Sequence, residues 1–172
     1  MTRLRLDRRF FLSVLIPLGL LLAGCLPSTG HPAKPAGNVG SAFLVRPIKH
    51  SVRYWVRLDR IISPARPATA QFFGPTAGTR LVAAVFTIYG ANHYYSADAE
   101  SNATLIGSDS KTYTASLFDN VTGCPSFGST FRIAPGLAAT GCVVFDVPDD
   151  VGIARIAWTT TATATTFVWW KG

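Results

Sequence analysis

The chain has 172 residues, of which 48% are hydrophobic and 15% are charged, and its formal net charge is +7 at pH 7. This length has room for one globular domain together with export signals. Four arginines and one aspartate precede Cys25, so the chain from Cys25 onward carries a net charge near +4. Because much of the basic excess lies in a targeting segment, we expect no nucleic-acid binding.

Residues 1–24 are typical of a signal peptide. Basic residues precede an apolar stretch from Phe10 to Leu22, which is too short to span a bilayer. The stretch ends in Leu22-Ala23-Gly24-Cys25, which resembles a bacterial lipobox. The resemblance implies cleavage before Cys25 and diacylglycerol on its thiol, and two acyl chains give stable membrane attachment. We therefore expect a lipid-anchored protein of the cell membrane that faces the periplasm or the exterior; an ordinary secretory cleavage site with an incidental cysteine is the alternative.

The segment from Asp7 to Ser13 also resembles a twin-arginine export signal. Arg8 and Arg9 form the pair, and Phe11-Leu12 follows at the expected spacing. Asp7 and Ser13 replace the usual flanking residues. The sequence leaves twin-arginine export and the general secretory route both open.

Residues 25–41 are predicted to form a flexible linker behind the lipidated cysteine. The segment Leu26–Gly40 is rich in Pro and Gly and has almost no bulky apolar residues, so it cannot bury enough surface to fold. Between Lys34 and Arg80, eight Lys or Arg side chains face only Asp59. A solvated surface explains this imbalance, and contact with anionic lipid or cell-wall polymer is the alternative.

Residues 42–172 read as a series of short strands. Leu81–Tyr89 is apolar on both faces, as expected of a central strand, whereas Val143, Phe145 and Val147 alternate with a more mixed face. No segment shows a sustained helical period. The spacing predicts an all-β, antiparallel, immunoglobulin-like β-sandwich of about eight strands. The other expected strands are Val52–Asp59, Ala103–Ile106, Thr112–Phe118, Thr130–Ile133, Ile153–Thr159 and Thr166–Trp170.

Cys124 and Cys142 are the remaining cysteines, and we expect them to form a disulfide. An exported chain reaches an oxidising compartment, where an even pair of cysteines usually becomes bonded. Two buried free thiols are the alternative. The absence of a C-x-x-C motif argues against a redox role.

Leu81–Asn92, Ala134–Pro148 and the aromatic segment Phe167–Trp170 resemble one group of proteins. It is the immunoglobulin-like β-sandwich domain of unknown function found in secreted and lipid-anchored bacterial proteins, and it includes a secreted immunogenic mycobacterial protein. The resemblance extends over about residues 45–172, and the Thr-rich Thr159–Thr166 departs from it. It implies the fold and an envelope location, and it carries no catalytic residues.

No catalytic or metal-binding motif is convincing. Ser108–Lys111 matches S-x-x-K, but it falls in a predicted turn, where the serine has no helix to present it. Asp98–Asn102 alternates oxygen ligands without the glycine of a calcium loop, so a solvated loop is favoured over a weak calcium site. His50 and His93 lack partners at zinc spacing. We therefore predict no enzyme activity, no metal and no cofactor.

Exposed aromatic residues are the remaining candidates for a site. Trp55, Tyr94, Tyr95 and Trp170 are predicted to form a binding patch, with packing inside the fold as the alternative. Trp169 and Trp170 are adjacent in a strand, so they must point to opposite faces. The resulting hypothesis is a lipid-anchored, non-enzymatic binding or interaction module with an envelope protein, glycan or lipid as partner. The alternative is an envelope carrier that holds glycan or lipid with exposed Trp and Tyr.

Overall fold

A computed structural model describes residues 35–46, 51–68, 75–116, 120–127, 130–160 and 165–171. All of them belong to one compact unit, Ala33–Gly172. In these ranges, no helix has the length and apolar character needed to cross a bilayer. Arg8, Arg9 and Cys25, and with them the predicted signal peptide and anchor, lie outside the described residues.

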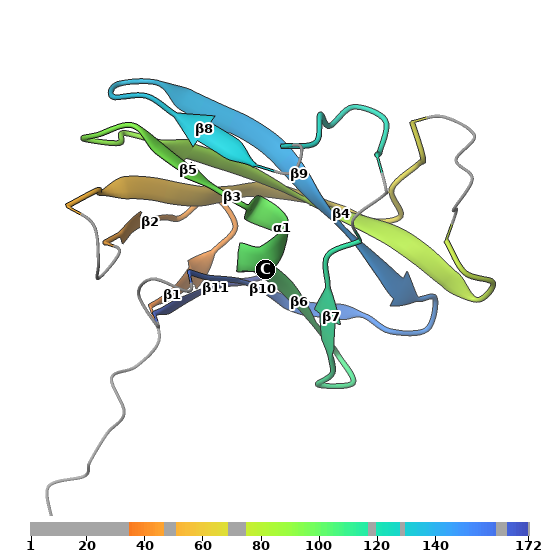
Figure 1. The fold of residues 1–172 in the computed structure, drawn as a ribbon. Helices are drawn as coiled ribbons and strands as arrows, with labels where there is room; N and C mark the ends of the chain where they lie inside the picture. The colour runs from red at the N-terminus through yellow and green to blue at the C-terminus, as the bar shows by residue number, and fades with distance from the viewer. Residues whose placement is uncertain are drawn as a thin grey trace, which may run out of the picture. The chain divides into compact units, whose positions relative to one another are not determined.

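The unit is a β-sandwich of two main sheets (Figure 1). Sheet A has the strand order β1-β11-β10-β6-β7, sheet B has the order β2-β3-β4-β9, and β5 pairs with β8 in a small additional sheet. Sheet A consists of β1 (Ala36–Asn38), β6 (Ala103–Gly107), β7 (Thr112–Thr114), β10 (Ile153–Thr159) and β11 (Thr166–Trp170). Sheet B consists of β2 (Ala42–Val45), β3 (Tyr54–Ile62), β4 (Thr79–Tyr89) and β9 (Ala138–Pro148), and the small sheet of β5 (Tyr95–Ala97) and β8 (Phe131–Ile133). The predicted all-β sandwich is confirmed.

Alternate side chains along each strand point inward and fill the space between the two sheets. Tyr54 and Phe86 of sheet B and Trp158 and Trp169 of sheet A are fully buried there. The ring centroids of Phe86 and Trp158 are 4.9 Å apart. Aromatic side chains bury large apolar areas and favour such tilted contacts, so they dominate the stability of this inner core.

A second hydrophobic cluster lies on the outer face of sheet B, where the sequence predicted an apolar face for β4 and a more mixed face for β9. Leu81 and Val85 of β4 and Val144 of β9 point away from the inner core and are nevertheless buried. Chain segments that carry Ala65 and Val121 cover them. Residues 81–86 of β4 and 141–145 of β9 are therefore buried on both faces.

The sandwich starts earlier in the chain than expected. Ala36–Asn38 had been assigned to the flexible linker, but it forms β1 and pairs in parallel with β11, the one parallel pair among the described strands. This segment has little hydrophobic pattern of its own, so only its neighbour in the sheet makes it a strand. The linker boundary at residue 41 was wrong for this reason.

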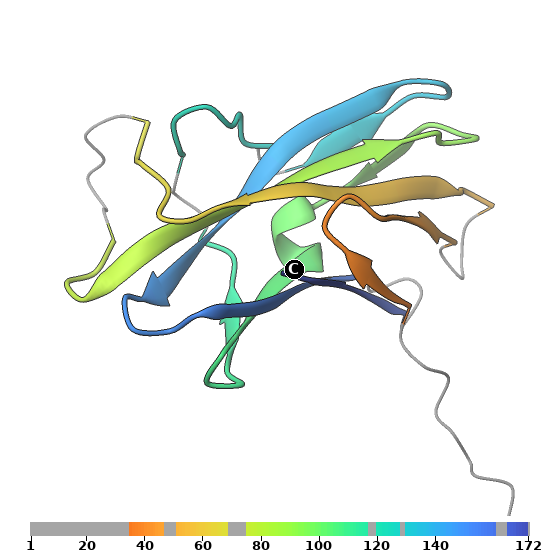
Figure 2. The ribbon, with the colours of Figure 1, turned by 180° about the vertical axis from the view of Figure 1, so that it is seen from behind.

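One short helix, α1 (Ala99–Asn102), joins β5 to β6 and lies between the two layers (Figure 2). Asp98 is its N-cap and accepts a hydrogen bond of 2.8 Å from the Glu100 backbone N–H. The segment considered as a calcium loop is thus a capped helical turn. Partial burial, together with the neighbouring Asp98, raises the pKa of Glu100.

Candidate binding faces of the sandwich

The outer face of sheet A carries a hollow of about 430 Å³. Its floor is a row of small or short side chains that crosses neighbouring strands: Ala36, Val168, Ala157 and Thr104. One wall is a row of larger residues: Trp170, Arg155, Ile106 and Thr112. The other wall is formed by Thr159 and Thr166. A low row between two higher rows is the physical origin of the hollow, which we call the sheet A groove.

A β-bulge places Arg155 in this groove. Ile153 and Ile156 both point into the inner core, although two residues separate them, because the register of β10 shifts between Ile153 and Arg155. Without the extra residue, regular alternation would turn Arg155 toward the core. Bulges commonly re-aim a side chain next to a functional site, so this irregularity marks Arg155 as a residue of interest.

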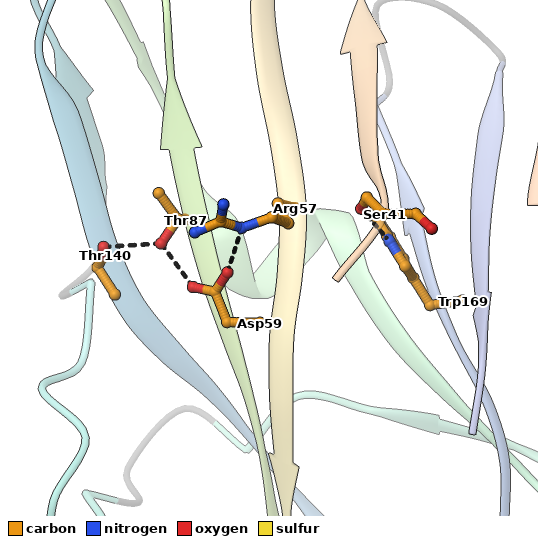
Figure 3. A network of polar contacts seen from close by, with 6 residues as sticks. All are labelled: Ser41, Arg57, Asp59, Thr87, Thr140 and Trp169. Carbon is orange, nitrogen blue, oxygen red and sulfur yellow. Dashed lines mark hydrogen bonds and ion pairs between the residues drawn. The ribbon is translucent and has the colours of Figure 1, made fainter. Parts of the chain in front are cut away.

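Trp170 is oriented by its neighbour in β11. Trp169 is fully buried, and its Nε1 donates a hydrogen bond of 2.7 Å to the Ser41 carbonyl oxygen (Figure 3). Trp170 must therefore point outward, and 44% of it is exposed. The prediction that the two adjacent tryptophans point to opposite faces of their strand is confirmed.

Each outer face has an arginine over an aromatic ring, but the electrostatic settings of the two arginines differ. On sheet A, the Arg155 guanidinium carbon lies 5.3 Å from the centroid of the Trp170 ring. On sheet B, the Arg57 guanidinium carbon lies 5.9 Å from the centroid of the Tyr89 ring. Arg57 also forms an ion pair with Asp59 (Figure 3). Among the described residues, no carboxylate lies within ion-pair distance of Arg155.

Asp59 belongs to a polar chain that crosses sheet B. Thr87 Oγ1 donates a hydrogen bond of 2.6 Å to Asp59 Oδ2, and it lies 2.8 Å from Thr140 Oγ1 (Figure 3). Both carboxylate oxygens of Asp59 therefore already have partners in the protein, Arg57 at Oδ1 and Thr87 at Oδ2. On sheet A, the hydroxyl oxygens of Thr159 and Thr166 lie 3.0 Å apart and share a hydrogen bond. Arg155, across the groove from them, has no counter-ion among the described residues.

Comparison with solved structures supports the fold and not a function. The crystal structure of MPT63, a secreted protein from Mycobacterium tuberculosis, superposes with a TM-score of 0.57 at 22% identity, over 80% of this chain and 98% of MPT63. An uncharacterized β-sandwich protein from Clostridium difficile superposes with a TM-score of 0.50 at 10% identity, over 85% of this chain and 99% of that chain. The chain shares their β-sandwich fold. No protein-family model and no curated protein matches the sequence.

Three of the four aromatic residues predicted to form a patch, Trp55, Tyr95 and Trp170, do not lie together, and the fourth, Tyr94, is 60% exposed. Trp55 is on the outer face of sheet B and Trp170 on the outer face of sheet A, because Tyr54 and Trp169 beside them both point into the inner core between the sheets. Tyr95 stacks on Tyr54 with ring centroids 5.0 Å apart, and burial raises its pKa. Strand alternation fixes how each side chain points, but only the topology decides which side chains meet.

Cys124 and Cys142 form a disulfide, with Cα atoms 5.8 Å apart. Both are buried in the outer cluster of sheet B with Leu81 and Val144, which sets the bridge well apart from the sheet A groove. It fastens the covering segment at Val121 to the sheet, so its position indicates a structural role.

Ser108–Lys111 is the turn between β6 and β7, as predicted. The Ser108 hydroxyl accepts a hydrogen bond of 2.9 Å from the Gly152 backbone N–H, and Asp109 accepts bonds from the Lys111 backbone and the Tyr113 hydroxyl. These side chains close the turn. Within the described ranges, no three His, Cys, Asp or Glu residues come together as a metal site would require.

The sequence reasoning missed Arg155 and the threonines of the groove. A usable signal was present: Arg155, Ala157 and Thr159 alternate with Ile156 and Trp158, so they share the outward face of one strand. What the sequence could not show is that Ala36 extends the groove, because no pattern predicts β1.

Proposed function

We propose that this protein is a lipid-anchored, non-enzymatic binding module of the cell envelope, and that its binding face is the sheet A groove. One observation carries the proposal: a bulged strand turns Arg155, without a counter-ion among the described residues, into a hollow beside the exposed Trp170. Exposed aromatic surface next to a few polar groups in a concave site is typical of binding sites.

The composition of the groove supports binding rather than catalysis. Its described lining consists of small, apolar and threonine side chains with one arginine, and it contains no His, Cys, Asp, Glu or Lys. A hydroxyl nucleophile needs a neighbouring base to become reactive, and none lines this hollow. The carrier alternative has less support, because the hollow lies on an outer surface while large aromatic side chains fill the space between the sheets.

The anchor rests on the segment from Leu22 to Cys25. MPT63, which shares the fold, is a secreted protein, and this supports the proposal that the present chain is exported. Replacement of Cys25 by alanine should release the protein from membranes into the soluble fraction. Retention of the Cys25→Ala variant in the membrane fraction would contradict lipid attachment.

The binding face can be tested by filling it. Ala157 is on the groove floor, so Ala157→Phe should occupy the hollow, and Ala138→Phe places the same ring on the outer face of sheet B as a control. We expect the full-length Ala157→Phe protein, purified in neutral detergent, to bind detergent-washed cell envelopes at least tenfold more weakly than wild type in a cosedimentation assay. The Ala138→Phe protein should bind as wild type. Equal binding by wild type and Ala157→Phe, with both folded by thermal unfolding, would overturn the assignment.

A further inference from the structure

We propose that the sheet A groove binds a glycan strand that bears carboxylates. Arg155 takes one carboxylate, Trp170 packs against a sugar ring, and the threonine hydroxyls bond to sugar hydroxyls. This inference deepens the proposed function and rests on it.

The described lining of the groove carries a positive charge. Arg155 is its one charged residue in the described lining, and no described carboxylate neutralises it. The guanidinium is planar, presents its N–H donors as a fork and matches a carboxylate with two parallel hydrogen bonds. The Arg155 guanidinium carbon lies 5.3 Å from the centroid of the Trp170 ring, so the cation and the exposed aromatic surface adjoin in the groove. Arg57 is the internal contrast, because Asp59 already fills the corresponding role on sheet B.

The lining around Arg155 is rich in hydroxyl groups and includes one exposed aromatic ring. Hydroxyl-bearing walls include Thr159 and Thr166 on one side and Thr112 on the other, with Thr104 on the floor. A hydroxyl both donates and accepts, which suits the hydroxyl groups of a sugar. Trp170 adds exposed aromatic surface for the apolar face of a ring. Aromatic and hydroxyl groups around one cation form a complementary surface for an acidic sugar.

The sheet A groove is elongated across four strands. The floor runs from β1 across β11 and β10 to β6, and three strand spacings make it about 15 Å long. A groove of this length takes a short stretch of polymer. Its small floor residues, Ala36 and Ala157 among them, let a ligand approach the sheet closely.

The same features disfavour two other ligands. A peptide that binds as an added strand needs a free sheet edge, whereas the groove lies on the face of β11, β10 and β6, each of which is paired on both sides. A bilayer surface is flat and would meet the walls while leaving the floor empty. The glycan is therefore the occupant that uses floor, walls and cation together.

The test uses polygalacturonate, a polymer of uronic acids, and its fully methyl-esterified form, which keeps the sugar backbone and removes the charge. Isothermal titration calorimetry on the full-length protein in neutral detergent at pH 7 gives the affinities. We expect wild type to bind the acid at least tenfold more tightly than the ester, and Arg155→Gln to remove that difference. Arg155→Lys should retain part of it, because the charge remains but the fork is lost.

Matched variants on sheet B serve as controls. Arg57→Gln should keep the preference for the acid, Trp170→Ala should weaken binding of both polymers, and Trp55→Ala should weaken neither. Arg155→Gln binding the acid as wild type does would overturn the inference. So would Arg155-dependent binding to phosphatidylglycerol vesicles without binding to the polymer, which would make the face a membrane contact. If wild type binds neither polymer while Ala157→Phe still loses envelope binding, the glycan assignment fails and the proposed binding face stands.

Discussion

The two outer faces of this sandwich are built differently, because part of the sheet B face is covered by further chain whereas the sheet A groove is open. On sheet B, outward residues such as Leu81, Val85 and Val144 are covered by a disulfide-linked segment and are buried. On sheet A, the outward threonines and Arg155 form an open groove. Both sheets share one core through their inner faces, but their outward side chains differ: the covered part of sheet B carries Leu81, Val85 and Val144, whereas the sheet A groove combines threonines, small side chains and Arg155.

The difference shows where a sandwich of this kind can carry function. Apolar outward rows must be covered, and the cover fixes that surface for a structural purpose. Polar outward rows remain accessible, and a single bulge can then place a charged side chain among them. Variants that alter one face and leave the other intact test this difference.

The largest effect is expected from the bridge on sheet B. The variant Cys124→Ala/Cys142→Ala should lose about 3 kcal/mol of unfolding free energy, because the bridge closes a loop over a sequence separation of 18 residues. Guanidinium unfolding followed by tryptophan fluorescence measures the loss, and the groove should keep its ligand affinity. Two reactive thiols at these positions in the denatured, unreduced protein would show that the bridge is absent.

Truncation of one apolar side chain on each face should separate the two layers. Leu81→Ala in the covered cluster should cost about 2 to 3 kcal/mol, at the low end for such changes because the covering segment can relax. Ile106→Ala in the groove wall should cost about 1 kcal/mol or less, since Ile106 is only half-buried. Equal losses in urea unfolding would mean that the sheet A face is also covered in solution.

A smaller, pH-dependent effect is expected in the inner core. The Tyr54 hydroxyl is buried without a hydrogen-bond partner, and burial raises its pKa well above 10, with Tyr95 adding to the shift. The unfolded chain releases this proton near pH 10, so native stability should be flat at neutral pH and should fall as the pH rises above about 10.

The Tyr54→Phe variant removes that titration. Its stability at pH 7 should differ from wild type by less than about 1 kcal/mol, because no hydrogen bond is lost. Above pH 10 it should lose less stability than wild type does. Parallel pH profiles of unfolding free energy for the two proteins would contradict the burial of this hydroxyl.

Much of the fold could be predicted from local pattern. Strands with clear alternation or a long apolar run, such as β4, β10 and β11, appear within two residues of their expected bounds. The sequence did not reveal β1, because Ala-Gly-Asn becomes a strand only through its parallel pairing with β11. The apolar character of both faces of Leu81–Tyr89 indicated a covered strand, but it did not reveal that the segments carrying Ala65 and Val121 provide the cover.

The candidate site could be predicted only in part. Trp170 was identified because it is adjacent to a second tryptophan, and alternation then required one of them to be exposed. The grouping of Trp170 with Trp55 failed because it depended on which strands share a sheet. Arg155 was overlooked although it alternates with Ile156 and Trp158; the register shift that lets Ile153 also point inward depends on the pairing of β10 with β6 and could not be predicted.

Oxidative footprinting of tryptophan tests the central claim most directly. Trp170 and Trp55 have similar exposed fractions, 44% and 39%, and lie on opposite outer faces, so each is a reference for the other. Hydroxyl-radical labelling of the full-length protein in its own envelopes, compared with the protein purified in detergent, should show Trp170 protected and Trp55 unchanged. Unchanged labelling of Trp170, or equal protection of both residues, would contradict the assignment of the sheet A groove as the binding face.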